Sequence, residues 1–150
     1  MTKSLFIILL ILLFYCWFSP MFKNINNLQY NIIVENLNGD RDINNLIRSN
    51  LKKYISIENR DELKIKVNTK YEKNIIAKDS TGKTTNYQIK ISAIFELDYS
   101  RGQKIITIEE TFDYKSIEDK LAELDYERSI KNNLTNIIIN KLITQISRLK

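Results

Sequence analysis

The chain has 150 residues, with 23 lysines and arginines against 18 acidic residues, so its net charge at pH 7 is +5. It contains no histidine, one cysteine, three glycines and one proline. This composition excludes histidine general bases, histidine-containing metal sites, a disulfide within one chain and glycine-rich phosphate loops. The cations are spread along the sequence, unlike the clustered charge of a nucleic-acid-binding domain, so we expect no nucleic-acid partner.

Residues 1–22 have the pattern of a signal peptide or a membrane anchor. Lys3 supplies a short positive region, and Leu5 to Phe18 is an unbroken apolar run. As a helix this run is about 21 Å long, against a hydrocarbon core of about 30 Å in a bilayer. The length therefore favours a signal segment, with a short uncleaved anchor as the alternative. In both cases we expect one domain, residues 23–150, tethered to a membrane outside the cytoplasm.

The only cysteine, Cys16, lies at the end of the apolar run. A bacterial lipoprotein signal places its acylated cysteine at this point. The preceding residues, Phe14 and Tyr15, are bulky where a lipoprotein signal peptidase prefers small ones. Cys16 is therefore a candidate for lipidation, and a buried cysteine in an ordinary anchor is the alternative.

Four segments alternate apolar and polar residues, which is typical of strands that bury one face. They are residues 28–35, 63–71, 87–99 and 106–114. The third has the strongest signal, with seven apolar residues in alternation. A polar turn at 79–83 separates the second and third segments, and Ser100–Gly102 connects the third and fourth as a short hairpin.

Two segments carry apolar residues three and four apart, as amphipathic helices do. The first runs from Ile43 to Ile55, with Asp40 or Asp42 as its N-cap, and the second follows Ser116 as its N-cap. The apolar stripe of the second helix comprises Ile117, Leu121, Leu124, Leu134, Ile138, Leu142, Ile146 and Leu149. The order β-α-β-β-β-α predicts a two-layer α/β (α+β) sandwich. In it, a four-stranded, mostly antiparallel sheet carries both helices on one face.

The sheet face away from the helices is expected to be polar and rich in lysine. Lysines two residues apart share one face of a strand, and an anionic lipid headgroup or an acidic partner surface would suit them. A solvated face is the alternative. The candidate contacts are Lys64, Lys66, Lys70 and Lys90 on this face, and Lys78 and Lys83 beside the 79–83 turn.

No segment predicts catalysis or cofactor binding. Gly82-Lys83-Thr84 resembles the end of a phosphate-binding loop, but Ala77 stands where that motif needs glycine, and the segment joins two strands. The acids Glu109 and Glu110 are neighbours on a strand, so they point to opposite faces and cannot act as a catalytic pair. We therefore expect no enzyme activity, no metal and no cofactor.

The sequence resembles a known family at three places. Residues 16–22, Cys-Trp-Phe-Ser-Pro-Met-Phe, resemble the start of the LPS-assembly lipoprotein LptE (RlpB) family, alphaproteobacterial type. That start reads Cys, Gly, Phe, a variable residue, Pro, Leu and Tyr. Tryptophan replaces the glycine here. Tyr87–Ile89 and Tyr126–Ile130 resemble a strand start and the C-terminal helix start of the same family, and the order of elements also matches.

The resemblance implies a non-enzymatic protein of the Gram-negative envelope, at the periplasmic face of the outer membrane. Such proteins plug the LptD β-barrel, help it assemble, and bind lipopolysaccharide on its way to the cell surface. The lysines would then meet lipopolysaccharide phosphates or acidic residues in the lumen. The alternative is a periplasmic auxiliary or lipid-binding subunit of an envelope transporter, tethered to the inner membrane, which an uncleaved anchor would favour.

Overall fold

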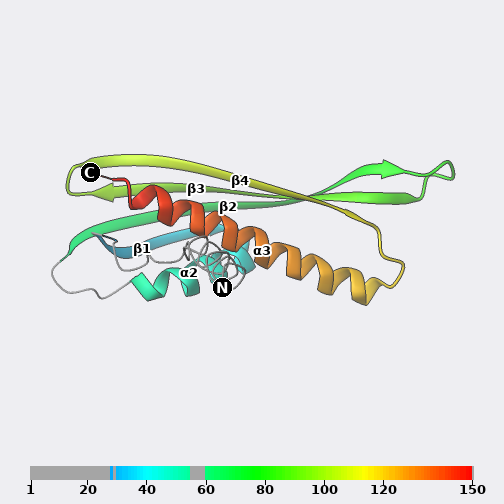
Figure 1. Cartoon of the computed structure of the whole chain (residues 1–150), viewed down its shortest axis with the longest axis horizontal. Helices are drawn as coiled ribbons and strands as arrows, with labels where there is room; N and C mark the ends of the chain where they lie inside the picture. Colours follow the sequence, from blue (N-terminus) through cyan, green and yellow to red (C-terminus); the bar gives the residue numbers. More distant parts are fainter. Residues whose placement is uncertain (1–27, 29, 55–59, 150) are drawn as a thin grey trace, which may run out of the picture.

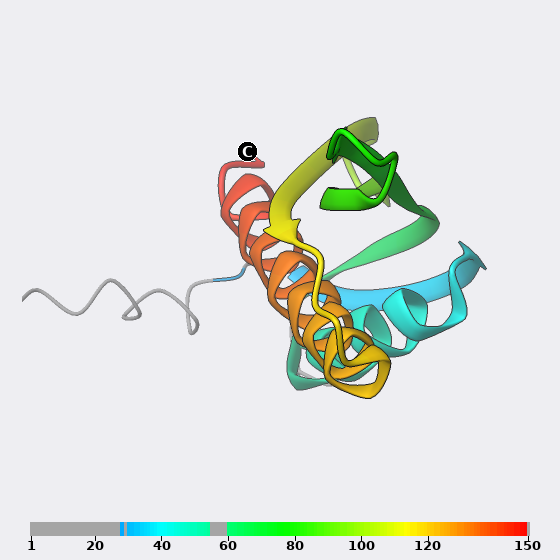
Figure 2. The ribbon, with the colours of Figure 1, turned by 90° about the vertical axis from the view of Figure 1, so that its right-hand side faces the viewer.

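The predicted strands and helices are present, and their order is confirmed. The computed structural model describes residues 28, 30–54 and 60–149, and its elements are β1 (Tyr30–Gly39), α2 (Arg41–Leu51), the 3-10 helix η2 (Lys52–Tyr54), β2 (Asp61–Lys78), β3 (Thr84–Tyr99), β4 (Gly102–Lys115) and α3 (Lys120–Ile146). The sheet order is β1-β2-β3-β4, with β1 parallel to β2 and the other neighbours antiparallel. Both helices lie on one face of the sheet (Figures 1 and 2). The predictions for residues 1–22, including Cys16, and the predicted helix end at Ile55 lie outside the described residues.

The alternation along the strands places one side of the sheet in the core. The antiparallel register sets Val67 of β2 and Ile106 of β4 on either side of Phe95 in β3. All three side chains are buried, and each contributes roughly 1.5–3 kcal/mol relative to an exposed one. The five innermost residues of β3 are essentially inaccessible to solvent: Ile89, Ile91, Ala93, Phe95 and Leu97. The face assignment predicted for the third strand is therefore confirmed.

The chain changes direction sharply between β1 and α2. Gly39 ends β1 with a φ of +99°, which glycine adopts at little cost, and its Cα is paired with Thr69 of β2. A Cβ here would lie 1.8 Å from the Thr69 carbonyl oxygen. The carboxylate of Asp40 then accepts hydrogen bonds of 3.0 Å from the N–H groups of Asp42 and Ile43. Of the two predicted candidates, Asp40 and Asp42, Asp40 is therefore the N-cap of α2.

The β2–β3 hairpin is longer than the alternation predicts. β2 continues from Tyr71 to Lys78, and the pairing runs from Glu72↔Lys90 as far as Lys78↔Thr84. No residue of this extension of β2 is buried, so alternation gives no signal there although the main chains stay paired. We call residues 72–90 the projecting arm. In Figure 1 it reaches beyond β1 and α2, with the 79–83 turn at its tip.

The start of α3 differs from the prediction. Ser116 is not the N-cap, because its N–H donates to the carbonyl oxygen of Thr85 at 2.8 Å and so extends the β3–β4 ladder. Asp119 caps the helix instead, with its carboxylate accepting from the N–H groups of Leu121 and Ala122 at 2.9 and 3.4 Å. The helix ends at Ile146, three residues before its predicted end, and is about 40 Å long.

The predicted apolar stripe of α3 is confirmed only in its C-terminal part. Leu134 and the later members are buried, whereas Leu121 is 75% exposed and Leu124 is also exposed. Glu123 and Glu127 take the sheet-facing positions in the first turns of the helix. The reason is the sheet surface opposite them, which offers a lysine and a tyrosine hydroxyl rather than apolar groups.

Replacing Gly39 by alanine is expected to destabilise the fold by roughly 3–4 kcal/mol, because a left-handed backbone and a collision with β2 add together. Gly82 is the matched control, since its φ is also positive, at +85°, but a Cβ there meets nothing within 4 Å. Gly82→Ala should cost only about 1–2 kcal/mol. Urea unfolding followed by circular dichroism measures both. Equal losses would contradict the close approach of Gly39 to Thr69.

Candidate functional site

The predicted lysine stripe lies on the bare face of the sheet, away from the helices, but it is not a basic patch. Lys64 lies 3.6 Å from Glu35, measured between Nζ and Oε1. Lys70 and Lys90 each lie 2.9 Å from a carboxylate oxygen, of Glu72 and Glu109 respectively. Carboxylates from three strands therefore balance the lysines, which gives a face of alternating charge.

The ion pairs hold both partners in their charged forms, and a hollow farther along the face is also lined by both signs of charge. Hydrogen bonding with Glu109 raises the pKa of the Lys90 ammonium, and hydrogen bonding from Lys70 lowers the pKa of the Glu72 carboxyl. These groups therefore stay charged at neutral pH. Farther along the face, opposite charges surround a shallow hollow of about 210 Å³ that includes Lys64, Lys66, Lys104, Glu35, Glu96 and Asp98 in its lining.

Lys66 differs from the other lysines of the stripe. It is paired in register with Glu96 of β3, but it makes no ion pair with any residue that the structure describes. Sequence reasoning placed the lysines on the correct face. It did not predict Glu35 beside Lys64 or Glu109 beside Lys90, because alternation gives the face of a residue and not the register between strands.

The lysines beside the turn form a separate group. The Asp79 carboxylate shapes the turn by accepting from the Thr81 N–H at 2.9 Å, the Thr81 hydroxyl at 2.6 Å and the Lys83 N–H at 3.0 Å. Lys83 also lies 3.4 Å from Glu118, whereas Lys78 has no ion pair within the described residues. Lys78 is twelve residues beyond Lys66 on the same strand, which is about 40 Å. The six candidate lysines therefore do not form one site.

A cluster of partly buried charge that the sequence pattern did not reveal lies between α3 and the projecting arm. The Glu127 carboxylate accepts a hydrogen bond from the Tyr114 hydroxyl at 2.6 Å and another from the Lys73 ammonium. That ammonium lies 4.0 Å from the centre of the Tyr87 ring. Burial and Glu127 raise the pKa of Tyr114, so its hydroxyl stays protonated as the donor. The cluster therefore joins α3 to the arm by charge and hydrogen bonding.

Glu123 extends this cluster toward the start of α3. Its side chain is buried, and it accepts a hydrogen bond of 2.8 Å from the Lys120 ammonium. This hydrogen bond lowers the pKa of the Glu123 carboxyl against the opposing effect of burial.

Glu109 and Glu110 of β4 point to opposite faces of the sheet, as predicted. Glu109 pairs with Lys90 on the bare face, and Glu110 pairs with Lys141 of α3 on the helix face.

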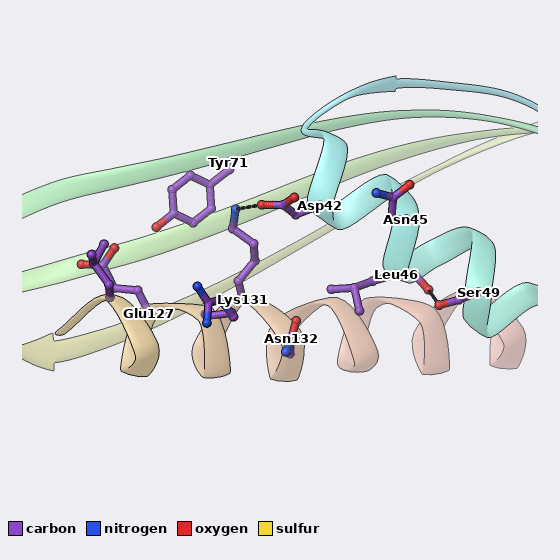
Figure 3. Close-up of a pocket in the computed structure, with 10 residues that line it drawn as sticks. Asp42, Asn45, Leu46, Ser49, Tyr71, Glu127, Lys131 and Asn132 are labelled. Carbon is purple, nitrogen blue, oxygen red and sulfur yellow. Dashed lines mark hydrogen bonds and ion pairs between the residues drawn. The ribbon is translucent and has the colours of Figure 1, made fainter. Parts of the chain in front are cut away.

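An open groove of about 800 Å³ lies between α2 and α3 (Figure 3). Lys131 points toward Tyr71 inside it, with its ammonium 4.4 Å from the ring centre. The same ammonium lies 3.4 Å from Asp40 and 3.5 Å from Asp42, so its charge is neutralised and it links α3 to the start of α2. Burial, with the charges of Glu127 and Asp40, raises the pKa of Tyr71 to about 12. The groove therefore presents a protonated phenol and a paired cation.

In the part of the chain that the structure describes, no group of three or more acidic or cysteine side chains is arranged to hold a metal ion. Neither α2 nor α3 has the length of apolar, weakly charged sequence that a membrane-spanning helix requires.

The fold is shared with solved structures of bacterial lipoproteins. Rare lipoprotein B from Shewanella oneidensis matches over 75% of this chain and 94% of its own, with a TM-score of 0.58 and 13% identity. A lipoprotein from Caulobacter crescentus matches over 81% and 89% (TM-score 0.54, 9% identity), and lipoprotein B from Nitrosomonas europaea over 84% and 90% (0.53, 12%). No protein-family model and no curated protein sequence matches the chain.

Replacing Glu123 by glutamine is expected to flatten the acid side of the stability profile. Because the pKa of Glu123 is lowered by folding, its charge stabilises the fold above the ordinary value of 4.5, and this contribution is lost as the pH falls through the lowered value. Unfolding free energies measured by urea from pH 7 to pH 3 should therefore fall less steeply in Glu123→Gln than in the wild type. Glu118→Gln is the control, since that carboxylate is 92% exposed. A Glu123→Gln profile parallel to the wild type would contradict this role.

Proposed function

We propose that this chain is a non-enzymatic assembly factor of the Gram-negative envelope, tethered to the periplasmic face of the outer membrane and similar to LptE. It occupies the lumen of an LptD-type β-barrel, supports the assembly of that barrel, and takes part in lipopolysaccharide transport to the cell surface. The N-terminal segment supplies the membrane tether, with Cys16 as the candidate site of acylation.

The observation that carries this proposal is the fold shared with rare lipoprotein B, which spans nearly all of that protein's chain. The name RlpB abbreviates rare lipoprotein B, and residues 16–22 resemble the start of that same family. The two likenesses are of different kinds, because one is read from the sequence of residues 16–22 and the other from the fold of the whole domain. Their agreement favours an LptE-like role over an unrelated sandwich of the same topology.

The bare sheet face supports the proposal through its chemistry. The interior of a large membrane barrel is polar and hydrated, so a plug needs a surface that tolerates water and offers hydrogen bonds. Paired charges such as Lys64–Glu35 and Lys90–Glu109 provide such a surface without a strong field of one sign. Lys66 and Lys78 make no ion pair with any described residue, and we assign them as the first candidates among the six lysines for contact with lipopolysaccharide phosphates.

A pull-down of the tagged full-length protein from its own envelope in mild detergent tests the proposed role. We expect a large outer-membrane β-barrel of LptD type in near-equal amount, identified by mass spectrometry. Recovery of inner-membrane transporter subunits would favour the auxiliary-subunit alternative, and recovery of no barrel would refute the plug role.

Reversing the charge of Lys64 and Lys66 together should leave the fold intact and weaken barrel or lipopolysaccharide binding. Both side chains lie on the exposed face, so the core is unaffected. The control is Arg48→Glu with Lys52→Glu, which makes the same change of net charge on exposed positions of α2 and η2. Barrel recovery that is unchanged in the Lys64 and Lys66 variant, or equally reduced in both variants, would contradict a contact through these lysines and favour the alternative of a solvated face.

A further inference from the structure

β4 forms one edge of the sheet, and its outward main-chain groups have no partner within the described residues. Tyr99 and Gly102 are paired across a two-residue connection, which makes them a hydrogen-bonded pair. Because such pairs alternate along an antiparallel ladder, the even-numbered residues of β4 bond to β3. The odd-numbered residues from Gln103 to Asp113 turn their N–H and C=O groups away from it. In Figure 1 the first part of β4 lies at the upper border of the molecule.

The edge of β4 lacks a proline and a bulge, two features that protect many edge strands. It contains no proline, and its pairing with β3 keeps one register from Gly102 to Lys115 with no bulge. The opposite edge, β1, is shorter and has a register shift between Val34 and Asn36. Bulges and short strands discourage pairing with another strand, whereas a long, regular edge invites it.

Exposed apolar side chains flank this edge on both faces of the sheet. On the bare face, Ile105 is 69% exposed, and Ile94 of β3 is also exposed. On the helix face, Phe112 of β4 is 42% exposed, and Tyr126 and Ile137 of α3 are exposed to a similar degree. A strand added to β4 would cover apolar surface on the helix side while pairing the free main-chain groups.

The charges beside the edge define the chemistry of the added strand. On the bare face, the odd-numbered residues of β4 from Gln103 to Asp113 include two carboxylates and no cation. Glu109 already pairs with Lys90 of β3, whereas Asp113 accepts a hydrogen bond from the neutral Gln88 and makes no ion pair with a described residue, so Asp113 is the acid that an added cation would face. Cross-strand neighbours of opposite charge are favourable, so the added strand should carry lysine, arginine or a hydroxyl on that side. On the other side it should carry apolar residues that pack beside Phe112.

We propose that β4 is a strand-addition site, which binds an extended segment of the barrel partner that alternates apolar with basic or hydroxyl residues. This inference rests on the proposed function for the identity of the partner, whereas the site itself rests on the edge. Main-chain hydrogen bonds supply the affinity, and the alternating pattern supplies the selectivity.

Thr107→Pro tests the site, because Thr107 is exposed and its N–H points away from β3, so proline removes an outward donor and spares the ladder. Thr107→Ala is the matched control, since it keeps the N–H and removes only the side chain. In the envelope pull-down, barrel recovery should fall roughly tenfold or more in Thr107→Pro and stay unchanged in Thr107→Ala. If Thr107→Pro unfolds, judged by circular dichroism, Ile137→Lys blocks the helix side of the same edge without touching the strand.

The outcomes separate the two proposals. Wild type and Thr107→Pro retaining equal amounts of barrel would overturn strand addition and leave the proposed function standing. Wild type retaining no barrel would refute the proposed function. A synthetic peptide then tests separately whether the edge of β4 binds an added strand. The probe is a fluorescent peptide with the sequence of residues 62–70, Glu-Leu-Lys-Ile-Lys-Val-Asn-Thr-Lys, which has the required alternation.

Peptide binding to full-length wild type and Thr107→Ala that weakens about tenfold or more in Thr107→Pro would support the site. Equal binding by all three proteins, or binding by none, would overturn it. Light scattering of the full-length protein in mild detergent, which measures its oligomeric state, is the last test. A wild-type dimer that Thr107→Pro converts to a monomer would show that the edge binds a second copy, and would overturn the assignment of a barrel segment.

Discussion

β3 is the strand on which the remainder of the structure depends. It is paired with β2 on one side and with β4 on the other along almost its whole length. Its alternate side chains therefore fix which residues of both neighbours enter the core, and a shift of one residue would turn every apolar group to the bare face. Phe95 lies at the centre of this arrangement, fully buried between Val67 and Ile106. The helices cover the face that this register creates.

The face covered by α3 changes character along the helix, and the charge of α3 changes with it. Over the central sheet, Leu134 and Ile138 of α3 are buried among apolar side chains. Toward the projecting arm, the sheet presents the Lys73 ammonium and the Tyr114 hydroxyl, and both donate hydrogen bonds to Glu127 of α3. A buried carboxylate without partners would cost several kcal/mol. The position of α3 over the arm is therefore coupled to this network, and not only to apolar packing.

The sequence allowed the face of each strand to be predicted, because period-two alternation records burial directly. Tyr87 to Tyr99 is the clearest example, and all of its predicted apolar positions face the helices. Alternation failed where burial ended, which is why β2 beyond Tyr71 was not predicted as strand. It also failed on α3, where Leu121 fits a helical period but Glu123 occupies the buried position. A period found in apolar residues cannot reveal a buried face made of charged ones.

The candidate site was predictable in the same partial sense. The lysines were placed on the bare face from their spacing alone. The neutralisation of Lys64 by Glu35 and of Lys90 by Glu109 depends on inter-strand register, which no single strand encodes, whereas Lys70 and Glu72 share a face of β2 because they are two residues apart. The distance of about 40 Å between Lys66 and Lys78 likewise depends on one uninterrupted strand joining them. The lysine-rich face predicted from spacing is therefore a face of alternating charge, on which Lys66 alone of the predicted stripe makes no ion pair with a described residue.

The difference between the two sheet edges bears on what kind of segment a barrel partner could contribute. Strands in the wall of a closed barrel have both edges paired, so they have no main-chain groups left for β4. The added strand must therefore come from a loop folded into the lumen, or from a part of the partner outside its barrel. A segment with only alternate apolar residues would not form a stable strand alone, because an isolated strand pair is marginal in water. Under the proposed function, pairing with β4 would order such a segment on binding, which would link barrel assembly to the presence of this protein.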